Sequence, residues 1–436
     1  MLLSRKDAEH VFESLRGGTV PDRGIEAFAV GIGPQRRELN RMLEVAAEAD
    51  GAVKFLRGGY GCGKTFMSNL GVHDAKQKNF VTSFVVVSDN DLHFHKFDEL
   101  YRKVVQALST TACPKGALGD ILDRWIGRIE EDLIRLGVDE ESDEFDTQVR
   151  AKVNEKLQTL TGGNVPPDMV RVVGAVFDLK QQGKLSEANS LISWLSGSTN
   201  VAQSEKKIAG VRGDIGSTDA MAYLRGILEI IKSAGYAGLV IVIDEAETIL
   251  RMRGDVRQKS LNGIRQICDD AKNYPGLLWL FTGTPAFFDD RRGVKGLEAL
   301  NDRIGFDEGG GFPSLRQPQL ALKPFNRDRL VKVAHKLRGL HPDADADQLE
   351  AKVHNGVIDK LVENVTAGFK GDVGVVPRHF LRQLVNMLDQ VVEYEDYNPE
   401  EHVGFAPKEL SPEEERVLQG QPEEASFSGA EVDFCA

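Results

Sequence analysis

The sequence predicts an α/β fold, a parallel sheet flanked by helices that carries a helical insertion and a C-terminal helical lid. The first observation is a glycine-rich stretch, GGYGCGKT, which stands between an apolar run at 52–56 and a helical run. The second is a pair of strongly apolar strands that recur far downstream, at 239–243 and 277–281. The third is a change after residue 323, where apolar residues recur only at helical spacing. Parallel strands require long crossovers, so widely spaced strands and intervening helices favour this fold.

The spacing of apolar residues predicts the remaining elements in order. A helix and a turn fall within residues 1–24, and a second helix begins at Pro34. A β-branched run, FVTSFVVV at 80–87, reads as a buried strand, and 319–322 reads as the last one. The other predicted helices span 97–109, 118–136, 146–160, 167–182, 185–196, 219–233, 328–337, 346–367 and 377–392.

The gap between the second and third core strands is far longer than a single crossover helix requires. The helical residues within that gap are therefore expected to form an inserted unit. The predicted organisation is an N-terminal helix with the first part of the core (1–111), a helical insertion (112–218), the second part of the core (219–322), a helical lid (323–398) and an acidic, disordered tail (399–436).

The stretch from Gly58 to Thr65 fits the phosphate-binding pattern G-x-x-x-x-G-K-[ST]. Glycines let successive backbone N–H groups curl around phosphate oxygens, and the helix N-terminus that follows adds partial positive charge. Lys64 is expected to reach the β- and γ-phosphates of ATP, and the Thr65 hydroxyl is expected to ligate Mg²⁺. The predicted nucleotide-binding residues are Gly58, Gly59, Tyr60, Gly61, Cys62, Gly63, Lys64, Thr65 and Phe66.

A second motif, LVIVIDEAET at 239–248, is an apolar strand that ends in two acids. Downstream of a phosphate-binding loop, Asp244 is expected to hold the Mg²⁺ shell, and Glu245 to orient and deprotonate the attacking water. The string DEAE, completed by Glu247, resembles a motif of two-lobed helicases. Those proteins need a second α/β lobe, and nothing after Phe325 reads as one. The helicase interpretation is therefore discounted.

Polar residues at the ends of two further strands are candidates for sensing the nucleotide. Thr282 is the first candidate for a contact to the γ-phosphate, and Thr284 is the second. Ser88 or Asn90, after the strand at 80–87, is a candidate for a contact that gates the catalytic acid. For each of them an ordinary turn at the end of a strand is an open alternative.

Two arginines are candidates for neutralising charge on the triphosphate. Arg303 is expected to act as an arginine finger on the ATP of a neighbouring subunit, with Arg291 and Arg292 as rivals. Arg378 follows Pro377, which suits the first turn of a helix, and is expected to reach ATP from the lid. An ordinary surface arginine is the alternative in each case.

The net charge of −13 is unevenly spread along the 436 residues. Residues 130–146 carry −8 and residues 407–436 carry −6, so the rest of the chain is near neutral. The acidity therefore neither supports nor excludes a partner such as double-stranded DNA. No apolar run approaches the roughly 18 residues of a membrane span. The four scattered cysteines form no CxxC pair, which favours a reducing, cytoplasmic location.

In combination, these motifs resemble the AAA+ ATPases, nearest to the origin-recognition-like branch. Four stretches, GGYGCGKTF, GLVIVIDEAETILRMRGDVRQKSLN, FTGTPAFFD and VGVVPRHFLRQLV, look like the ATP-binding BrxD family of BREX phage-exclusion systems. The resemblance covers nearly the whole chain. It implies a cytoplasmic bacterial or archaeal defence ATPase that acts with a modification methyltransferase and other BREX components. A homo-oligomer is expected as well.

Two classes of function remain open from the sequence. One is a hydrolysing AAA+ motor or loader that closes on ATP and remodels DNA or a partner complex. The other is a nucleotide-gated scaffold that hydrolyses slowly and acts by binding DNA or proteins. A loader ATPase of another DNA transaction is the nearest rival biology. Glu245 favours hydrolysis, since a scaffold does not need a base for water.

Overall fold

The centre of the molecule is a six-stranded sheet with the strand order β3-β2-β4-β5-β1-β6. The structure, a computed structural model, describes residues 3–48, 50–88, 92–142, 144–159, 165–368 and 376–402. Five strands run parallel, and β3 pairs antiparallel with β2. This confirms the predicted α/β fold and adds β3, which the sequence analysis missed. The strands are β1 (Ala52–Arg57), β2 (Val81–Val86), β3 (Leu108–Ser109), β4 (Leu239–Asp244), β5 (Leu277–Gly283) and β6 (Gln319–Ala321).

The strands of the sheet are buried on both faces. In β4, Leu239, Ile241 and Ile243 belong to one hydrophobic core. The alternate residues Val240 and Val242 belong to the core on the opposite face. This explains the continuous apolar run, because a strand covered on both sides has no polar face. The parallel register also brings the carboxyl ends of the strands to one edge, where the glycine-rich stretch and Asp244 lie.

Helices cover both faces of this sheet. On one face lie α2 (Gly33–Glu48) and α3 (Lys64–Gln77), which are joined by a bidentate ion pair between Arg36 and Asp74. Apolar residues of three other helices join the core of the opposite face. These helices are α4 (Phe97–Gln106), α10 (Ala220–Ser233) and α11 (Gly254–Asp270).

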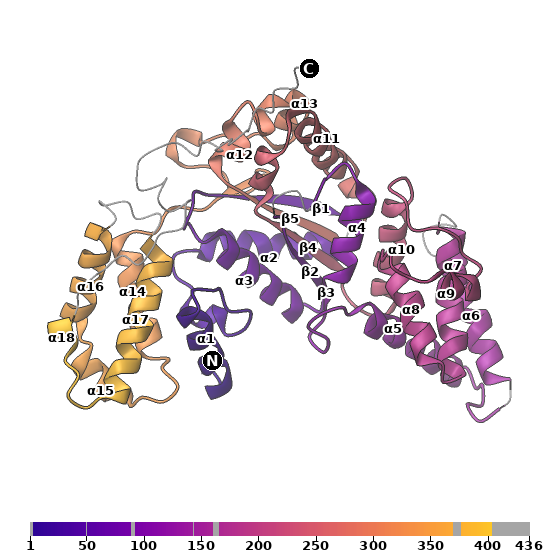
Figure 1. Ribbon diagram of the computed structural model, residues 1–436, viewed down its shortest axis with the longest axis horizontal. Helices are drawn as coiled ribbons and strands as arrows, with labels where there is room; N and C mark the ends of the chain where they lie inside the picture. The colour runs from indigo at the N-terminus through magenta and orange to yellow at the C-terminus, as the bar shows by residue number, and fades with distance from the viewer. Residues whose placement is uncertain are drawn as a thin grey trace, which may run out of the picture.

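The segment between β3 and α10 is helical, as its periodicity predicted. Figure 1 shows it extending from the side of the core that lies opposite the lid. Trp125 and Trp194 lie in its buried interior, and Trp194 meets Tyr223 of α10 edge to face. One short helix, α9, was not predicted. The helices are α5 (Leu118–Arg135), α6 (Phe145–Thr159), α7 (Pro167–Gln181), α8 (Leu185–Leu195) and α9 (Gln203–Ile208).

The helices after β6 form a bundle on the other side of the core (Figure 1). The single helix predicted over 346–367 is wrong, because the chain breaks at Val353, whose φ of −105° and ψ of 55° are not helical. Part of the predicted tail is also helical, as α18 (Pro399–His402), while residues 403–436 lie outside the described residues. The bundle consists of α14 (Arg327–Arg338), α15 (Ala346–Lys352), α16 (Asn355–Gly368) and α17 (Val376–Glu393).

The N-terminal helix α1 (Arg5–Arg16) packs against α17 of this bundle. Arg16 makes a bidentate ion pair with Asp389, at 2.7 and 2.8 Å. His341 Nε2 lies 3.1 Å from the same carboxylate, and the ring of His341 packs edge-on against Phe12. Burial acts to raise the pKa of Asp389, but the hydrogen bonds from Arg16 and His341 lower it on balance. The two ends of the folded chain therefore form one unit beside the core.

A buried ionic cluster fixes the loop that leads into β6. The Lys54 side chain on β1 is buried, and its Nζ donates to Glu38 Oε1 over 3.0 Å. It also donates to the carbonyl oxygens of Leu315 and Gln317, at 2.8 and 2.7 Å. Burial lowers the pKa of Lys54, against the raising effect of Glu38. All three ammonium protons are thus used inside the protein.

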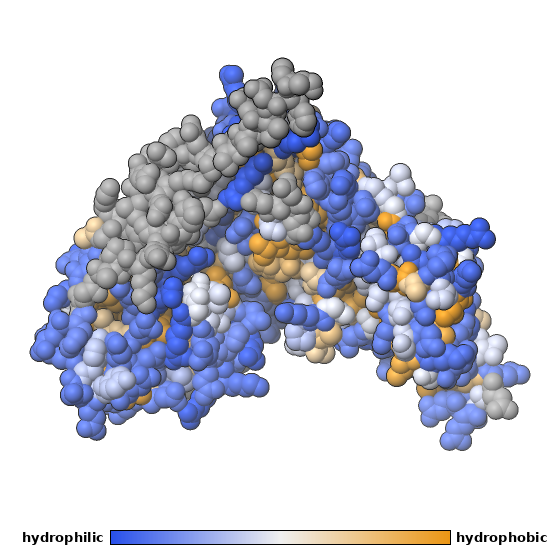
Figure 2. Space-filling view, in the orientation of Figure 1, coloured by the Kyte–Doolittle hydropathy of each residue, from blue (hydrophilic) through white to orange (hydrophobic). Residues whose placement is uncertain are grey.

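The remaining elements are short. None of the described helices is long and apolar enough to cross a membrane. The outer surfaces of the lid and of α11 are mainly hydrophilic (Figure 2). The short elements are η1 (Ile25–Phe28), η3 (Ala246–Arg251), η4 (Ala271–Asn273), α12 (Pro285–Asp289), η5 (Val294–Gly296), α13 (Glu298–Ile304) and η6 (Gly309–Gly311).

Candidate functional site

The glycine-rich loop lies between β1 and α3, as the sequence predicts. Gly61 and Gly63 have φ angles of 70° and 84°, in the left-handed region that favours glycine. Gly63 caps α3, so the first backbone N–H groups of the helix have no partner within it. Lys64 Nζ donates to the carbonyl oxygens of Gly58 and Gly59, at 3.0 and 3.3 Å. Loop donors, helix terminus and ammonium group together make a site suited to phosphate.

Thr65 and Asp244, which were predicted to share a metal ion, are brought together. Thr65 Oγ1 donates to Asp244 Oδ2 over 2.8 Å. The other carboxylate oxygen accepts a hydrogen bond of 2.6 Å from Thr282 Oγ1. The hydroxyl of Thr282 in turn accepts the backbone N–H of Glu245, at 3.0 Å. Hard oxygen donors of this kind fit Mg²⁺, which takes one or two carboxylates and completes its shell with phosphate and water.

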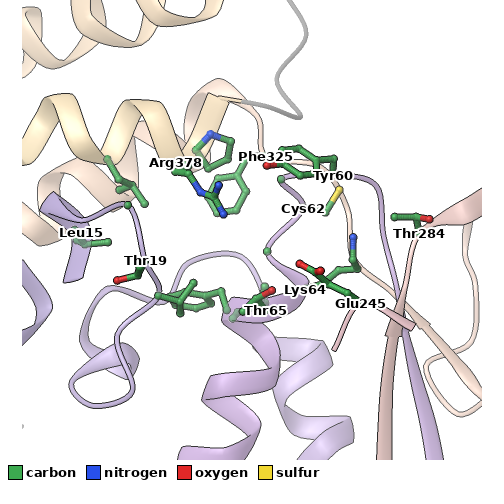
Figure 3. A pocket seen from close by; sticks show the side chains of 18 of the residues that line it. Leu15, Thr19, Tyr60, Cys62, Lys64, Thr65, Glu245, Thr284, Phe325 and Arg378 are labelled. Carbon is green, nitrogen blue, oxygen red and sulfur yellow. The ribbon is translucent and has the colours of Figure 1, made fainter. Parts of the chain in front are cut away.

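Glu245 occupies an unusual backbone conformation directly after β4. Its φ of 62° and ψ of 43° are left-handed, which few non-glycine residues adopt. The residue is exposed and lines the cavity above the loop. Figure 3 shows its side chain beside Lys64. Strained residues of this kind cluster at functional sites, where surrounding structure holds them in place.

A cavity of about 310 Å³ lies between the loop, the N-terminal segment and the lid. Its apolar end is made by residues that precede β1 and by lid residues. Phe325 of the lid lies close to Gly63, so the two segments approach each other across the loop. An apolar end of this kind suits a flat aromatic ring better than a charged group. The apolar lining includes Leu15, Val20, Phe28, Val30, Ile32, Phe325, Leu330 and Val333.

The structure places the candidate arginines differently. Arg378 lies at the start of α17, lines the cavity and points toward it from the lid (Figure 3). Arg303 does not line the cavity; it pairs with Asp269 of α11 and also bonds the carbonyl of Ala299. The side chain of Arg303 is 39% exposed, so it remains accessible to a neighbouring molecule.

The two threonine candidates also occupy different places. Thr282 is fully buried behind Asp244 and does not line the cavity. Thr284 does line it, and its buried Oγ1 has no hydrogen-bond partner among the described residues. Ser88 follows β2, in which Val86 pairs with Asp244, while Asn90 lies outside the described residues. The geometry therefore favours Thr284 over Thr282 for a direct contact to bound nucleotide.

Glu247 is a member of the site that the sequence analysis set aside as part of a helicase-like string. Its Oε1 lies 3.7 Å from Lys64 Nζ, and the side chain is 22% exposed. Its Oε2 is buried without a partner in the described part of the chain. Burial raises the pKa of Glu247 to about 7, although Lys64 opposes the rise. The turn of η3 brings Glu247, the third residue after Asp244, back to the phosphate-binding loop.

The comparisons with known proteins identify the ligand class of this site. Residues 3–407 match the family model of the BREX system ATP-binding protein BrxC/D. The chain belongs to this BrxC/D family. No curated protein matches the chain. A solved structure, the Walker-type ATPase PABY2304 of Pyrococcus abyssi, aligns over 84% of this chain and 78% of its own, with 11% identity and a TM-score of 0.32. As a BrxC/D-family protein, the chain is an ATP-binding protein.

We expect Glu247→Gln to tighten ATP binding about threefold to tenfold, because the variant removes a carboxylate beside Lys64 that competes with phosphate. The raised pKa fixes the sign of a pH effect. The protonated carboxyl is favoured below pH 7, so ATP binding by the natural protein should weaken as pH rises through about 7. Calorimetric titration with ATP from pH 6 to 8 measures both effects. Equal affinity and equal pH dependence in the two proteins would contradict the assigned contact.

Proposed function

We propose that this BrxC/D-family protein is a cytoplasmic ATP hydrolase of AAA+ type, which couples ATP-dependent assembly to remodelling of DNA or of a partner complex. The observation that carries the proposal is the hydrogen bond of 2.8 Å between Thr65 Oγ1 and Asp244 Oδ2. It joins the end of the phosphate loop to the last residue of β4, directly before the candidate base Glu245. A protein that only bound phosphate would not need an acidic pair at this point.

In the proposed reaction the residues from Gly58 to Phe66 hold the triphosphate, with Lys64 on the β- and γ-phosphates. Lys64 must then leave the carbonyl oxygens of Gly58 and Gly59. Thr65 and Asp244 would hold Mg²⁺, which neutralises charge on the phosphates when bound. Glu245 orients a water molecule and accepts its proton as the oxygen attacks the γ-phosphorus, which releases ADP and phosphate.

Thr282 serves this reaction as a positioning residue. Its hydroxyl is committed to Asp244 Oδ1 and to the N–H of Glu245, so it holds the two acids in a fixed relation. Thr284, which lines the cavity, is better placed than Thr282 for the γ-phosphate contact, while Arg378 approaches the phosphates from the lid. When the lid closes on ATP, Arg378 would contact the phosphates. Helix α1 would move with the lid, because the ion pair of Arg16 and Asp389 joins it to α17.

The second candidate function is a nucleotide-gated scaffold with slow hydrolysis, and a loader of another DNA transaction is a third. The contact between Lys64 and Glu247 favours the nucleotide-gated scaffold, because bound nucleotide must displace Glu247 from Lys64. BREX membership favours partners from that system, including its methyltransferase, and both hypotheses accommodate them. The two functions differ in whether turnover is needed for activity.

Assembly through Arg303 can be tested by mixing two inactive variants. Lys64→Ala should lose ATP at its own site, and Arg303→Ala should fail to complete the site of its neighbour. If Arg303 acts between subunits, about a quarter of the head-to-tail interfaces in a mixture have an intact Lys64 on one side and an intact Arg303 on the other. The mixture should then regain about a quarter of the natural ATP turnover. A mixture of Lys64→Ala with Glu245→Gln is the control, since both changes affect the same site. Turnover no higher in the first mixture than in the control would contradict the role of Arg303, and light scattering with ATP reports assembly directly.

A further inference from the structure

Positively charged side chains gather on one surface of the core, beside the turn that follows β4. They come from segments 251–259 and 290–295, which together hold seven Arg or Lys residues and two Asp residues. The segments adjoin, because Arg292 Nη2 donates to the carbonyl oxygen of Leu250 over 2.9 Å. We call this surface the basic patch. It consists of Arg251, Arg253, Arg257, Lys259, Arg291, Arg292 and Lys295.

Most of the basic patch is open to solvent. Lys259, Arg291 and Lys295 are exposed and have no ion-pair partner in the described part of the chain. Arg253 is 84% exposed and lies 3.5 Å from Asp255, a surface pair of little strength. Figure 1 shows α11, α12 and α13 at one end of the core, away from the lid and from the tip of the insertion. The patch therefore differs from the two acidic runs, 130–146 and 407–436, which carry most of the negative charge of the chain.

Two arginines, Arg257 and Arg292, lie side by side at the centre of the basic patch, with Asp290 as the carboxylate nearest to them. Arg257 Nη1 donates to the carbonyl oxygen of Met252 over 2.9 Å, and Arg292 bonds that of Leu250. Arg257 Nε is buried and has no partner among the described residues. Burial lowers the pKa of Arg257 and the neighbouring Arg292 lowers it further, and these two effects outweigh the raising effect of Asp290. Two adjacent guanidinium groups with spare donors are a site for an anion.

We propose that the basic patch binds the phosphate backbone of duplex DNA. The planar donor forks of its arginines match phosphate, and seven cations on one surface match a regular polyanion. Single strands are bound by aromatic stacking as well as charge. The exposed large aromatic residues in the described part of the chain are Phe312 and Tyr394, and neither lies in the patch. This deepens the proposed function by naming the surface, and it depends on that function only for the coupling to hydrolysis.

The position of the basic patch connects it to the ATP site. Strand β4 ends at Asp244, Glu245 follows, and η3 leads directly into the patch. At the end of η3, Arg257 and Arg292 donate hydrogen bonds to backbone carbonyl oxygens. The same guanidinium groups would donate to a bound phosphate. Phosphates of DNA therefore compete with the end of η3 for the same donors. Binding of DNA would shift η3 and would thereby change the position of Glu245, which directly precedes it.

The test uses the full chain and a fluorescent 20-base-pair duplex of arbitrary sequence, without ATP, at several salt concentrations. The patch variant combines Arg253→Ala, Lys259→Ala and Lys295→Ala, none of which holds η3 or lines the cavity. The charge-matched control combines Lys184→Ala, Lys207→Ala and Arg212→Ala, three exposed residues of the insertion. Removing three phosphate contacts should weaken binding at least about tenfold and reduce the salt slope by about 2 to 3, while the control changes less than about twofold.

Several results would overturn the proposal. Absence of duplex binding by the natural protein would do so, as would an equal loss in the patch variant and the control. Binding of poly-glutamate but not of duplex at the patch would assign it to an acidic protein instead. Unchanged duplex binding with lost ATP-dependent assembly would assign it to the ATP of a neighbouring copy. Basal ATP turnover of both variants, measured separately, should match that of the natural protein, so failure of DNA binding and failure of the ATPase function are distinguished.

Discussion

Glu245→Gln is expected to hold ATP without hydrolysing it, with turnover reduced by about 10² to 10⁴-fold, the usual contribution of a positioned general base. Glutamine keeps the shape of the side chain and removes its capacity to accept a proton. The left-handed backbone of Glu245 and the hydrogen bond from its N–H to Thr282 should survive, since neither involves the carboxylate. Phosphate release and retention of labelled ATP on the protein, measured together, check the two halves of the expectation.

Lys64→Ala is the matched comparison for that variant. It should lose affinity for ATP as well as turnover, because Lys64 is the cation assigned to the phosphates. A Glu245→Gln protein that hydrolyses ATP at more than about a tenth of the natural rate would remove Glu245 from the role of general base. Glu247, which lies 3.7 Å from Lys64, would then be the acid to replace next.

Lys54→Ala is expected to lower the free energy of unfolding by about 3 to 5 kcal/mol, the cost of removing one partner from a buried ion pair. The variant leaves Glu38, which is 4% exposed, with one cation fewer inside the protein. It also removes the donor to the carbonyl oxygens of Leu315 and Gln317. The midpoint of urea unfolding, compared with that of the natural protein, measures the change.

The control for this variant is Lys78→Ala. Lys78 also pairs with a glutamate, Glu44, at 2.9 Å, but this pair lies at the surface. Its loss should cost no more than about 1 kcal/mol. If the two substitutions had the same small effect, the cluster around Lys54 would not be holding the loop before β6. That loop follows Arg303, so a weakened cluster should also reduce complementation in the mixing experiment.

The placement of the phosphate-binding loop between a strand and a helix could be predicted, because it depends on a short, local motif. Gly58 to Thr65 needs only a strand before it and a helix after it, and both follow from apolar spacing. The pairing of Thr65 with Asp244 could be predicted although 178 residues separate them in the sequence. It follows from the rule that parallel strands present their carboxyl ends at one edge. The insertion did not disturb this, since its helices pack beside the sheet.

The side-chain contacts and short elements that could not be predicted from the sequence depend on short-range geometry. The contact of Glu247 with Lys64 arises from the turn of η3, and no periodicity encodes a 3₁₀ turn of six residues. The choice between Thr282 and Thr284 depends on which hydroxyl points back to Asp244, and the sequence does not show that β5 ends between the two residues. The break at Val353 and the short strand β3 were missed for a similar reason, because apolar spacing continues through both. The pairing of Arg257 with Arg292 required two segments to be brought together by the fold.

The measurement that tests the central claim most directly is steady-state release of phosphate from ATP by the full chain, with Mg²⁺ and after chelation, with and without duplex DNA. A hydrolase built around Thr65, Asp244 and Glu245 should turn over ATP only with Mg²⁺, and DNA should stimulate it through the basic patch. Tight binding of ATP with no phosphate release under either condition would contradict hydrolysis. The nucleotide-gated scaffold would then describe this protein.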